Sequence, residues 1–476
     1  MERAVSGRKA FWLLGLTALS LSLSACQGLL QVPKPPVEAL GAGELLEARP
    51  GESREVRVRL APEAQGAEVY LRLADPCAKG TASCPGWDVS RYPGVEHTRE
   101  RFTLSASQPE ATFTLSVAQN ALPQGPFKWE VVAVDGTGKE WPFPVYLRIP
   151  YGDRGAVAAL REWRARAGLP GVEEDPEWAW RGWLHSRYAV MNYPDNLPHD
   201  EDLAQPFASE GGQGAGRIGN EWGYLYKWNG QPYWRPDQVP VNWWIAAPFH
   251  RFNLVYPWPL RVGSGTYRDV GPVPGYGDGF GRSRSTFPNL SPWTSTSPVR
   301  EVLFPSPGMR VPLGTYQGRE SPNPTYPCSH PTAPAKPPFL TQGGLTWDDG
   351  QGVVRVPIGF PITLMTFAQA DTEVLEARVV RLSDGAENPV CAYGSLQYWE
   401  DREFWRDGAL KGLRAYGAVV VLPHNPLTPG AEYEVHLKAR IGSGLWEKTW
   451  RFQVEGEGNL WPLRLREGQE EFMEIR

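Results

Sequence analysis

The chain has 476 residues, which at about 150 residues per domain predicts roughly three domains. Its formal net charge is −5, with 48 basic and 53 acidic side chains, so the sequence lacks the basic surface that a nucleic-acid-binding protein requires. Hydrophobic residues make up 41% of the chain and tryptophan occurs 21 times, which excludes a largely disordered protein.

The N-terminus has the layout of an export signal. Three positive charges precede an apolar run at residues 11–23, which is too short to cross a bilayer core of about 30 Å as a helix. The run ends in Leu-Ser-Ala-Cys at residues 23–26, which resembles the bacterial lipobox, where cleavage precedes the cysteine and its thiol is acylated. We therefore expect a signal peptide at 1–25, then the lipidated Cys26 and a linker over 26–41. An ordinary signal peptide is the alternative.

Four further cysteines favour disulfides, because an exported chain reaches an oxidising compartment. Cys77 and Cys84 close a short loop, whereas Cys328 lies in a proline-rich loop and Cys391 in a strand-like region. We pair Cys77 with Cys84, and Cys328 with Cys391, because each pair falls inside one predicted domain. A four-cysteine zinc site is the alternative, but the spacing lacks paired CxxC knuckles.

Residues 42–150 contain short runs rich in Val, Thr and aromatic residues, with apolar and polar positions alternating. Gly, Pro and Asn separate the runs, a pattern typical of an antiparallel, Ig-like β-sandwich. The expected strands cover 56–60, 69–73, 102–105, 111–117, 129–134 and 144–149.

Residues 151–300 change to a mixed helical and strand pattern. Asp153 is placed to cap a first helix, and Asp175-Pro176 to begin a second one. Helical spacing of apolar residues predicts one buried face on the second helix, formed by Trp180, Leu184, Tyr188 and Met191. A glycine-rich loop at 210–216 and a short helix at 241–247 follow.

Residues 301–456 return to strand patterns and predict a second β-sandwich, followed by a charged tail at 457–476. The expected strands cover 353–356, 362–367, 377–382, 419–422, 433–439 and 450–454.

Short motifs in the middle segment resemble, in order, those of the CAP superfamily (cysteine-rich secretory proteins, antigen 5, pathogenesis-related 1) in its bacterial, SCP-like form. They are ALREWRARAGLP (159–170), WLHSRYAVMN (183–192), LPHDEDL (197–203), FASEGGQGAG (207–216), WWIAAPFHR (243–251) and RVGSGTY (261–267). The resemblance implies an α+β fold: a central CAP-like α-β-α sandwich flanked by two all-β, Ig-like sandwich domains.

The resemblance also implies a cleft lined by two histidines and two acidic residues. It assigns His199 and His250 as the histidines, and either Glu210 or Glu221 as the first acid. The position of the second acid holds no carboxylate, unless Asp237 replaces it from the preceding turn.

Two neutral imidazoles and a carboxylate are a typical three-ligand set for Zn²⁺. His199 and His250 are therefore candidate zinc ligands, although the same groups can form a polar cleft without metal. The chain has no HExxH motif, so the sequence gives no support to metalloprotease chemistry. We interpret His185 as a helix residue that packs beside the cleft.

These patterns predict an envelope-anchored lipoprotein that binds an extracellular hydrophobic or cell-envelope ligand without converting it. The missing second acid argues against catalysis, because general acid–base chemistry usually needs two groups with separated pKa values. A zinc-dependent hydrolase with Glu210 as base, acting on peptides or peptidoglycan, is one alternative, and a structural or adhesive envelope protein is the other. The expected partners are the membrane, through Cys26, and a lipid or cell-wall ligand. Gln27, which is not an Asp, favours an outer-membrane or cell-surface location.

Overall fold

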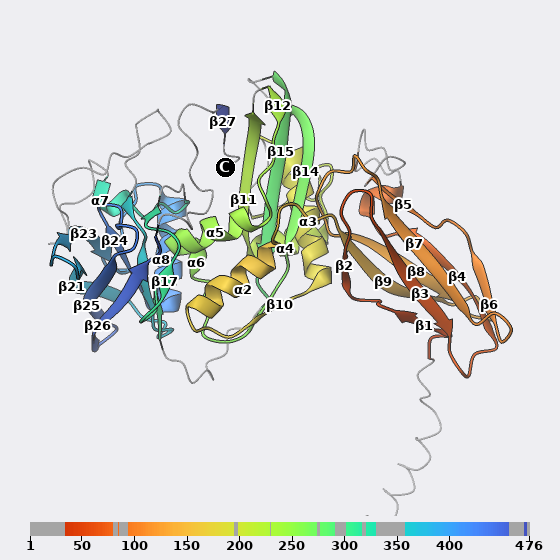
Figure 1. The fold of residues 1–476 in the computed structure, drawn as a ribbon, viewed down its shortest axis with the longest axis horizontal. Helices are drawn as coiled ribbons and strands as arrows, with labels where there is room; N and C mark the ends of the chain where they lie inside the picture. Colours follow the sequence, from red (N-terminus) through yellow and green to blue (C-terminus); the bar gives the residue numbers. More distant parts are fainter. Residues whose placement is uncertain are drawn as a thin grey trace, which may run out of the picture.

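The computed structural model describes residues 34–79, 84, 94–194, 199–228, 230–273, 277–290, 301–316, 320–329, 358–456 and 471–473. The predicted signal peptide, Cys26 and the expected strand at 353–356 lie outside these residues. In the part that is described, no helix is long and apolar enough to cross a membrane. The elements follow one another along the long axis, from the N-terminal strands through a mixed middle segment to the C-terminal strands (Figure 1).

The N-terminal segment forms two mainly antiparallel sheets that face each other across one hydrophobic core. In β3 (Ser53–Leu60), Val56, Val58 and Leu60 point inward while the arginines between them stay at the surface, the period-two pattern of a half-buried strand. The first sheet has the order β1 (Val37–Leu40), β3, β7 (Glu110–Val117), β5 (Val95–His97). The second has the order β2 (Leu45–Glu47), β9 (Glu140–Arg148), β8 (Phe127–Val134), β4 (Gly66–Leu73), β6 (Phe102–Ser105).

The middle segment is built on an antiparallel sheet. Its strands are β12 (Gln231–Pro232), β11 (Gly219–Trp228), β15 (Gly277–Pro288) and β14 (Gly265–Val273), and β27 (Glu471–Met473) adds to β11. Its helices are α2 (Ala156–Arg166), α3 (Pro176–Met191), α4 (Glu210–Ile218), α5 (Gln238–Ala246) and α6 (Pro248–Arg251), and β10 (Val172–Glu174) pairs in parallel with β13 (Leu260–Val262).

The helix starts follow local chemistry. α3 begins at the Asp175-Pro176 pair, where the Asp175 carboxylate accepts the backbone N–H of Trp178 at 3.0 Å. α2 begins after Gly155 rather than at Asp153. The expected glycine-rich loop at 210–216 is wrong, because these residues form α4 with Ser209 as N-cap.

The predicted fold class, with a central α-β-α sandwich, is also wrong. The described residues are mostly β, with 42% strand and 19% helix. The middle segment shares its cores with both β segments: Trp163 of α2 and Trp244 of α5 belong to the C-terminal core, whereas Trp183 of α3 belongs to the N-terminal core. Its helices therefore pack against the two β segments as well as against the middle sheet.

The C-terminal segment again contains two larger sheets. One has the order β16 (Val302–Phe304), β20 (Ile362–Met365), β24 (Ala418–Pro423), β23 (Val390–Tyr393). The other has the order β17 (Arg310–Val311), β26 (Gly444–Val454), β25 (Glu432–Ile441), β21 (Thr372–Arg381), β22 (Glu387–Asn388). A small pair, β18 (Thr315–Tyr316) and β19 (Ile358–Gly359), and two helices, α7 (Tyr326–Ser329) and α8 (Glu403–Tyr416), complete it. The strand patterns of residues 301–456 gave no indication of α8.

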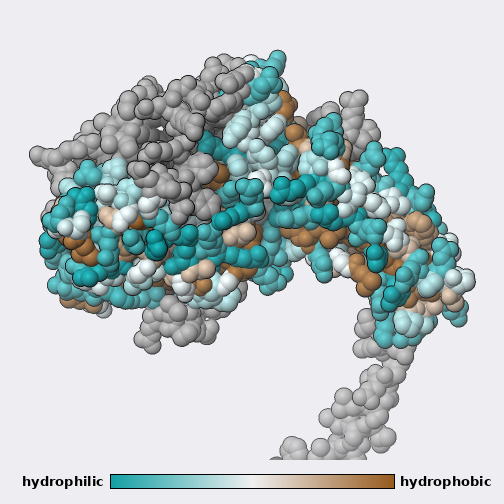
Figure 2. All heavy atoms as spheres, in the orientation of Figure 1, coloured by the Kyte–Doolittle hydropathy of each residue, from teal (hydrophilic) through white to brown (hydrophobic). Residues whose placement is uncertain are grey.

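Two disulfides are present, Cys77–Cys84 and Cys328–Cys391, with the pairing expected from the sequence. Hydrophobic residues appear on the visible face only as small patches within a mainly hydrophilic surface (Figure 2).

Candidate functional site

A buried cluster of charged side chains lies where α3 and α4 cover β11 and β15. His185 of α3 is fully buried, with Nδ1 3.0 Å from Glu201 Oε1 and Nε2 2.7 Å from Glu221 Oε1. Arg284 of β15 pairs with the other oxygen of Glu221, and His199 Nδ1 lies 3.4 Å from Glu221 Oε1. We call His185, His199, Glu201, Glu221 and Arg284 the His185 cluster.

His185 and Glu221 hold each other in their charged forms. Burial alone lowers the pKa of His185, but the carboxylates of Glu221 and Glu201 outweigh it and raise the pKa to about 9. Burial alone raises the pKa of Glu221, but the charges of Arg284 and the two histidines hold it well below its ordinary value. At neutral pH, His185 is therefore an imidazolium between two carboxylates.

Glycines of α4 make room for the cluster. A Cβ on Gly216 would lie 2.5 Å from the His185 ring, and a Cβ on Gly212 would overlap the Glu201 carboxylate. Glycine is a poor helix former, so this helix depends on its packing and on its cap. Ser209 provides the cap, because its side chain accepts the N–H of Gly212 at 3.0 Å.

His199 forms the exposed edge of the cluster. Its φ of 59° is left-handed, a backbone conformation that is unusual outside glycine and often found at functional sites. Its Nδ1 donates a hydrogen bond to the carbonyl of Gly216 at 3.2 Å, because a carbonyl oxygen only accepts. This bond leaves Nε2 at the outer edge of a side chain that is 42% exposed.

The predicted cleft residues divide between two faces of the sheet. Asn220 and Glu221 are consecutive in β11, so their side chains point to opposite faces. Glu221 contacts His199, whereas the Asn220 side chain donates to the backbone carbonyl of His250 at 3.0 Å. The His250 ring instead lies 2.9 Å from Glu320 of the C-terminal segment. The structure therefore places His199 and His250 in different environments.

The other two acidic candidates do not join the cluster. Glu210 is the exposed first residue of α4. Asp237 pairs with Arg268 at 2.7 Å and accepts the backbone N–H of Tyr151 at 3.0 Å, so it has a structural role.

Sequence reasoning missed His185 and Glu201. His185 is adjacent in α3 to Leu184, a predicted core residue, and the sequence predicts only that it packs beside the cleft. The available signal was the spacing of Gly212 and Gly216, four residues apart on one face of α4, which left space for side chains from a neighbouring element.

The structure does not bring the two predicted zinc ligands together, because His199 lies beside Glu221 and His250 beside Glu320. No group of three or more His, Cys, Asp or Glu side chains in the described part of the chain is arranged to hold a metal ion. In the His185 cluster, both nitrogens of His185 already lie within 3.0 Å of a carboxylate oxygen.

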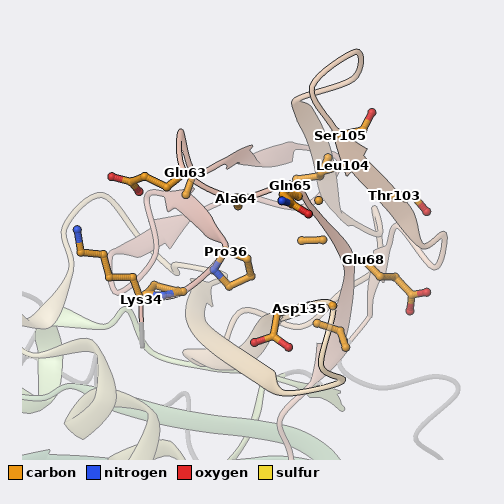
Figure 3. A pocket seen from close by; sticks show the side chains of 16 residues that line it. Lys34, Pro36, Glu63, Ala64, Gln65, Glu68, Thr103, Leu104, Ser105 and Asp135 are labelled. Carbon is orange, nitrogen blue, oxygen red and sulfur yellow. The ribbon is translucent and has the colours of Figure 1, made fainter. Parts of the chain in front are cut away.

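A cavity of about 1510 Å³ opens at one end of the N-terminal sandwich (Figure 3). Pro36, Ala64 and Leu104 surround the hollow, and the charged ends of Lys34 and Glu63 extend away from its centre (Figure 3). The remaining lining comes from Pro35, Ala61, Gln65, Gly66, Ala67, Glu68, Thr103, Ser105, Val134, Asp135 and Gly136. Pro36 and Leu104 are buried, so the accessible lining combines the apolar residues Pro35, Ala61 and Ala64 with charged and polar side chains, a mixture that suits an amphiphilic ligand.

No family model and no curated protein match this chain. Among solved structures, the PapD-like domain 7 of human CEP192 is 14% identical, over 26% of this chain and 94% of that one, with a TM-score of 0.18. The Pseudomonas aeruginosa CupB2 chaperone is 16% identical over 24% and 55%, with a TM-score of 0.18. The YadV chaperone is 8% identical over 87% and 99%, also with a TM-score of 0.18. These scores are too low to assign a fold.

The expected CAP resemblance is therefore wrong. No family model supports it, and the described residues contain about twice as much strand as helix. The two histidines that the resemblance places in one cleft lie against opposite faces of the sheet.

Substitution of Gly216 by Ala is expected to destabilise the protein by about 1–3 kcal/mol, because the new Cβ would overlap the His185 ring. Gly214→Ala in the same helix is the matched control, since its nearest neighbour is 4.0 Å away. That control should be neutral or stabilise by up to about 1 kcal/mol. Thermal unfolding of both variants measures the difference, and equal effects would contradict this role of Gly216.

The stability of the protein is expected to fall as the pH rises from 6.5 to about 9. The folded state raises the pKa of His185 above its ordinary value, so this stabilisation is complete below pH 6.5 and disappears as the folded imidazolium loses its proton. The loss is on the order of 2–3 kcal/mol. Unfolding midpoints measured across this range should show the fall in the native protein and a flatter profile in His185→Gln. His436→Gln, on the outer face of the C-terminal sheet, should retain the native profile.

Proposed function

We propose that this chain is a non-catalytic binding protein, held at the extracytoplasmic face of the cell envelope by lipid on Cys26. The observation that carries the proposal is the cavity at the end of the N-terminal sandwich. Lys34 lies in its wall and follows Cys26 by eight residues, 34 − 26. An extended segment of that length spans at most about 28 Å, so the anchor would keep the cavity close to the membrane surface.

The chemistry of the cavity favours a hydrophobic or amphiphilic envelope ligand. Its volume of about 1510 Å³ exceeds the size of ordinary small-molecule sites, which hold roughly 300–1000 Å³. The partly exposed apolar residues Pro35, Ala61 and Ala64 would contact a hydrocarbon part, while the charged rim would remain in contact with water. A structural role in the envelope fits the same β-rich fold, but a cavity of this size favours binding.

The His185 cluster supports a role without catalysis. General acid–base chemistry needs a group that exchanges protons near the working pH. His185 is buried with both nitrogens engaged, and Arg284 keeps Glu221 ionised. The cluster therefore suits the positioning of α3 and α4 more than proton transfer.

The two disulfides support an extracytoplasmic location, because disulfides form and persist in oxidising compartments. The export signal and lipobox-like cysteine of the sequence agree with that location.

If the cavity holds a ligand, a bulky side chain introduced into its wall should displace that ligand. Ala64→Trp places a large side chain in the wall of the cavity, whereas Ala42→Trp, beyond the other end of β1, is the control. The full chain of the native protein and of both variants would be purified from the cell envelope, extracted with organic solvent and examined by mass spectrometry. Co-purified amphiphile should be present in the native and control proteins and reduced at least fivefold in Ala64→Trp. Equal amounts in all three proteins, or none in any, would refute the proposed site.

Lipidation can be tested separately with radioactive palmitate. The native full chain should take up the label and sediment with membranes, because acyl chains on one cysteine supply the anchor. Cys26→Ser should lose the label and appear in the soluble fraction, whereas Cys77→Ser should keep it. A labelled Cys26→Ser protein would show that the anchor lies elsewhere.

A further inference from the structure

The disulfide Cys77–Cys84 of the N-terminal segment packs against a loop of the middle segment. Both cysteines are buried in one small hydrophobic cluster with Phe207, and Met191 packs against it. Cys77 lies in the 3-10 turn η1 (Pro76–Lys79) that follows β4, whereas Phe207 lies just before α4. The cross-link is therefore part of the surface that holds this loop.

Phe207 needs such support because its backbone is unfavourable. Its φ is 63°, in the left-handed region, which is unfavourable for a residue with a side chain. The same surface includes an ion pair, since Arg187 lies 2.8 Å from Asp75 and its guanidinium is 5.8 Å from the Phe207 ring. Asp75 also accepts the backbone N–H of Cys77 at 2.7 Å, which ties the disulfide turn to α3.

The loop held by Phe207 positions Glu201. Ser209, two residues after Phe207, donates its backbone N–H to Glu201 Oε2 at 2.6 Å. Gln213 of α4 donates to the Glu201 carbonyl at 2.7 Å. The other carboxylate oxygen, Oε1, then reaches His185 Nδ1 at 3.0 Å. A chain of direct contacts thus leads from the disulfide to one of the two carboxylates that surround His185.

We propose that formation of the Cys77–Cys84 disulfide completes the His185 cluster, so that the cluster assembles only after the chain reaches an oxidising compartment. In the reduced chain, Phe207 lacks its cross-linked support, the loop relaxes from its left-handed conformation, and Glu201 leaves His185. Glu221 stays in place because Arg284 and β11 hold it independently.

The redox step is an ordinary thiol–disulfide exchange. The thiolate of one cysteine attacks the disulfide of an envelope dithiol oxidase, and the second cysteine then resolves the mixed disulfide. The S–S bond of Cys77–Cys84 forms while that of the oxidase breaks. The oxidase sulfurs receive the two electrons and two protons that the cysteines release.

The proton affinity of His185 provides the readout. The charged groups that face its ring are Glu201 and Glu221, with Arg284 and His199 reaching it through Glu221, and the Tyr188 ring stacks 6.3 Å away. Only Glu201 depends on the disulfide surface. Its loss would remove one of two favourable carboxylates and lower the pKa of His185.

The experiment is a pH titration of the seven histidines in the full chain, monitored by NMR with histidine-selective labelling. The His185 signal is assigned as the one that the His185→Gln variant lacks. The proton affinity of His185 should fall at least tenfold in the native chain refolded under reducing conditions and in the Cys77→Ala/Cys84→Ala variant. Phe207→Ala, which keeps the disulfide, should produce a similar fall. The reduced native chain retains both sulfur atoms and their packing, so a fall in this chain is an effect of the missing cross-link and not of smaller side chains.

The control is Cys328→Ala/Cys391→Ala, which removes the disulfide of the C-terminal segment and should leave His185 unchanged. An unchanged His185 in the Cys77→Ala/Cys84→Ala variant would overturn the proposal. An equal fall in the control would also overturn it, because the effect would then be general loosening of the fold. The result does not depend on the cavity or on lipidation.

Discussion

Buried arginines that bind backbone carbonyls hold together parts of this chain that are far apart in the sequence. Arg251 of α6 is fully buried between the rings of Phe304 and Phe360, and it donates to the carbonyl of Pro361 at 2.8 Å. Arg164 of α2 donates to the carbonyls of residues 170, 254 and 258. Burial lowers the pKa of both guanidinium groups to about 9, which leaves them charged at neutral pH. The planar fork of arginine permits several such bonds at once, which lysine does not offer.

The need to compensate buried charges also shapes the His185 cluster. A buried charge is tolerated only when neighbouring groups compensate it. Here the cations of His185 and Arg284 balance the carboxylates of Glu201 and Glu221, and glycines in α4 allow the approach. Removal of one partner would leave the others buried without compensation, so the cluster positions α3, α4 and β11 as a unit. Its stability depends on the complete set rather than on any one pair.

Local chemistry made part of this structure predictable. The Asp175-Pro176 cap, the alternating strand of β3 and the pairing of Cys77 with Cys84 follow from neighbouring residues. The separation of His199 from His250 does not, because it depends on Asn220 and Glu221 pointing to opposite faces of a strand whose register is set by β15. The α4 helix was mistaken for a loop because its glycines are poor helix formers, and packing against His185 outweighs that propensity.

The N-terminal sandwich is more than a spacer, because one of its strands connects two features of the molecule. β4 begins at Gly66, in the wall of the cavity, and ends at Leu73, shortly before Cys77. Its eight residues extend about 26 Å at strand geometry. Because β4 pairs with β8 along most of its length, it forms a stiff connection rather than a flexible one. A disulfide at one end that supports the His185 cluster, and a cavity at the other end that Lys34 lines, are therefore held at a constant separation by the sheet.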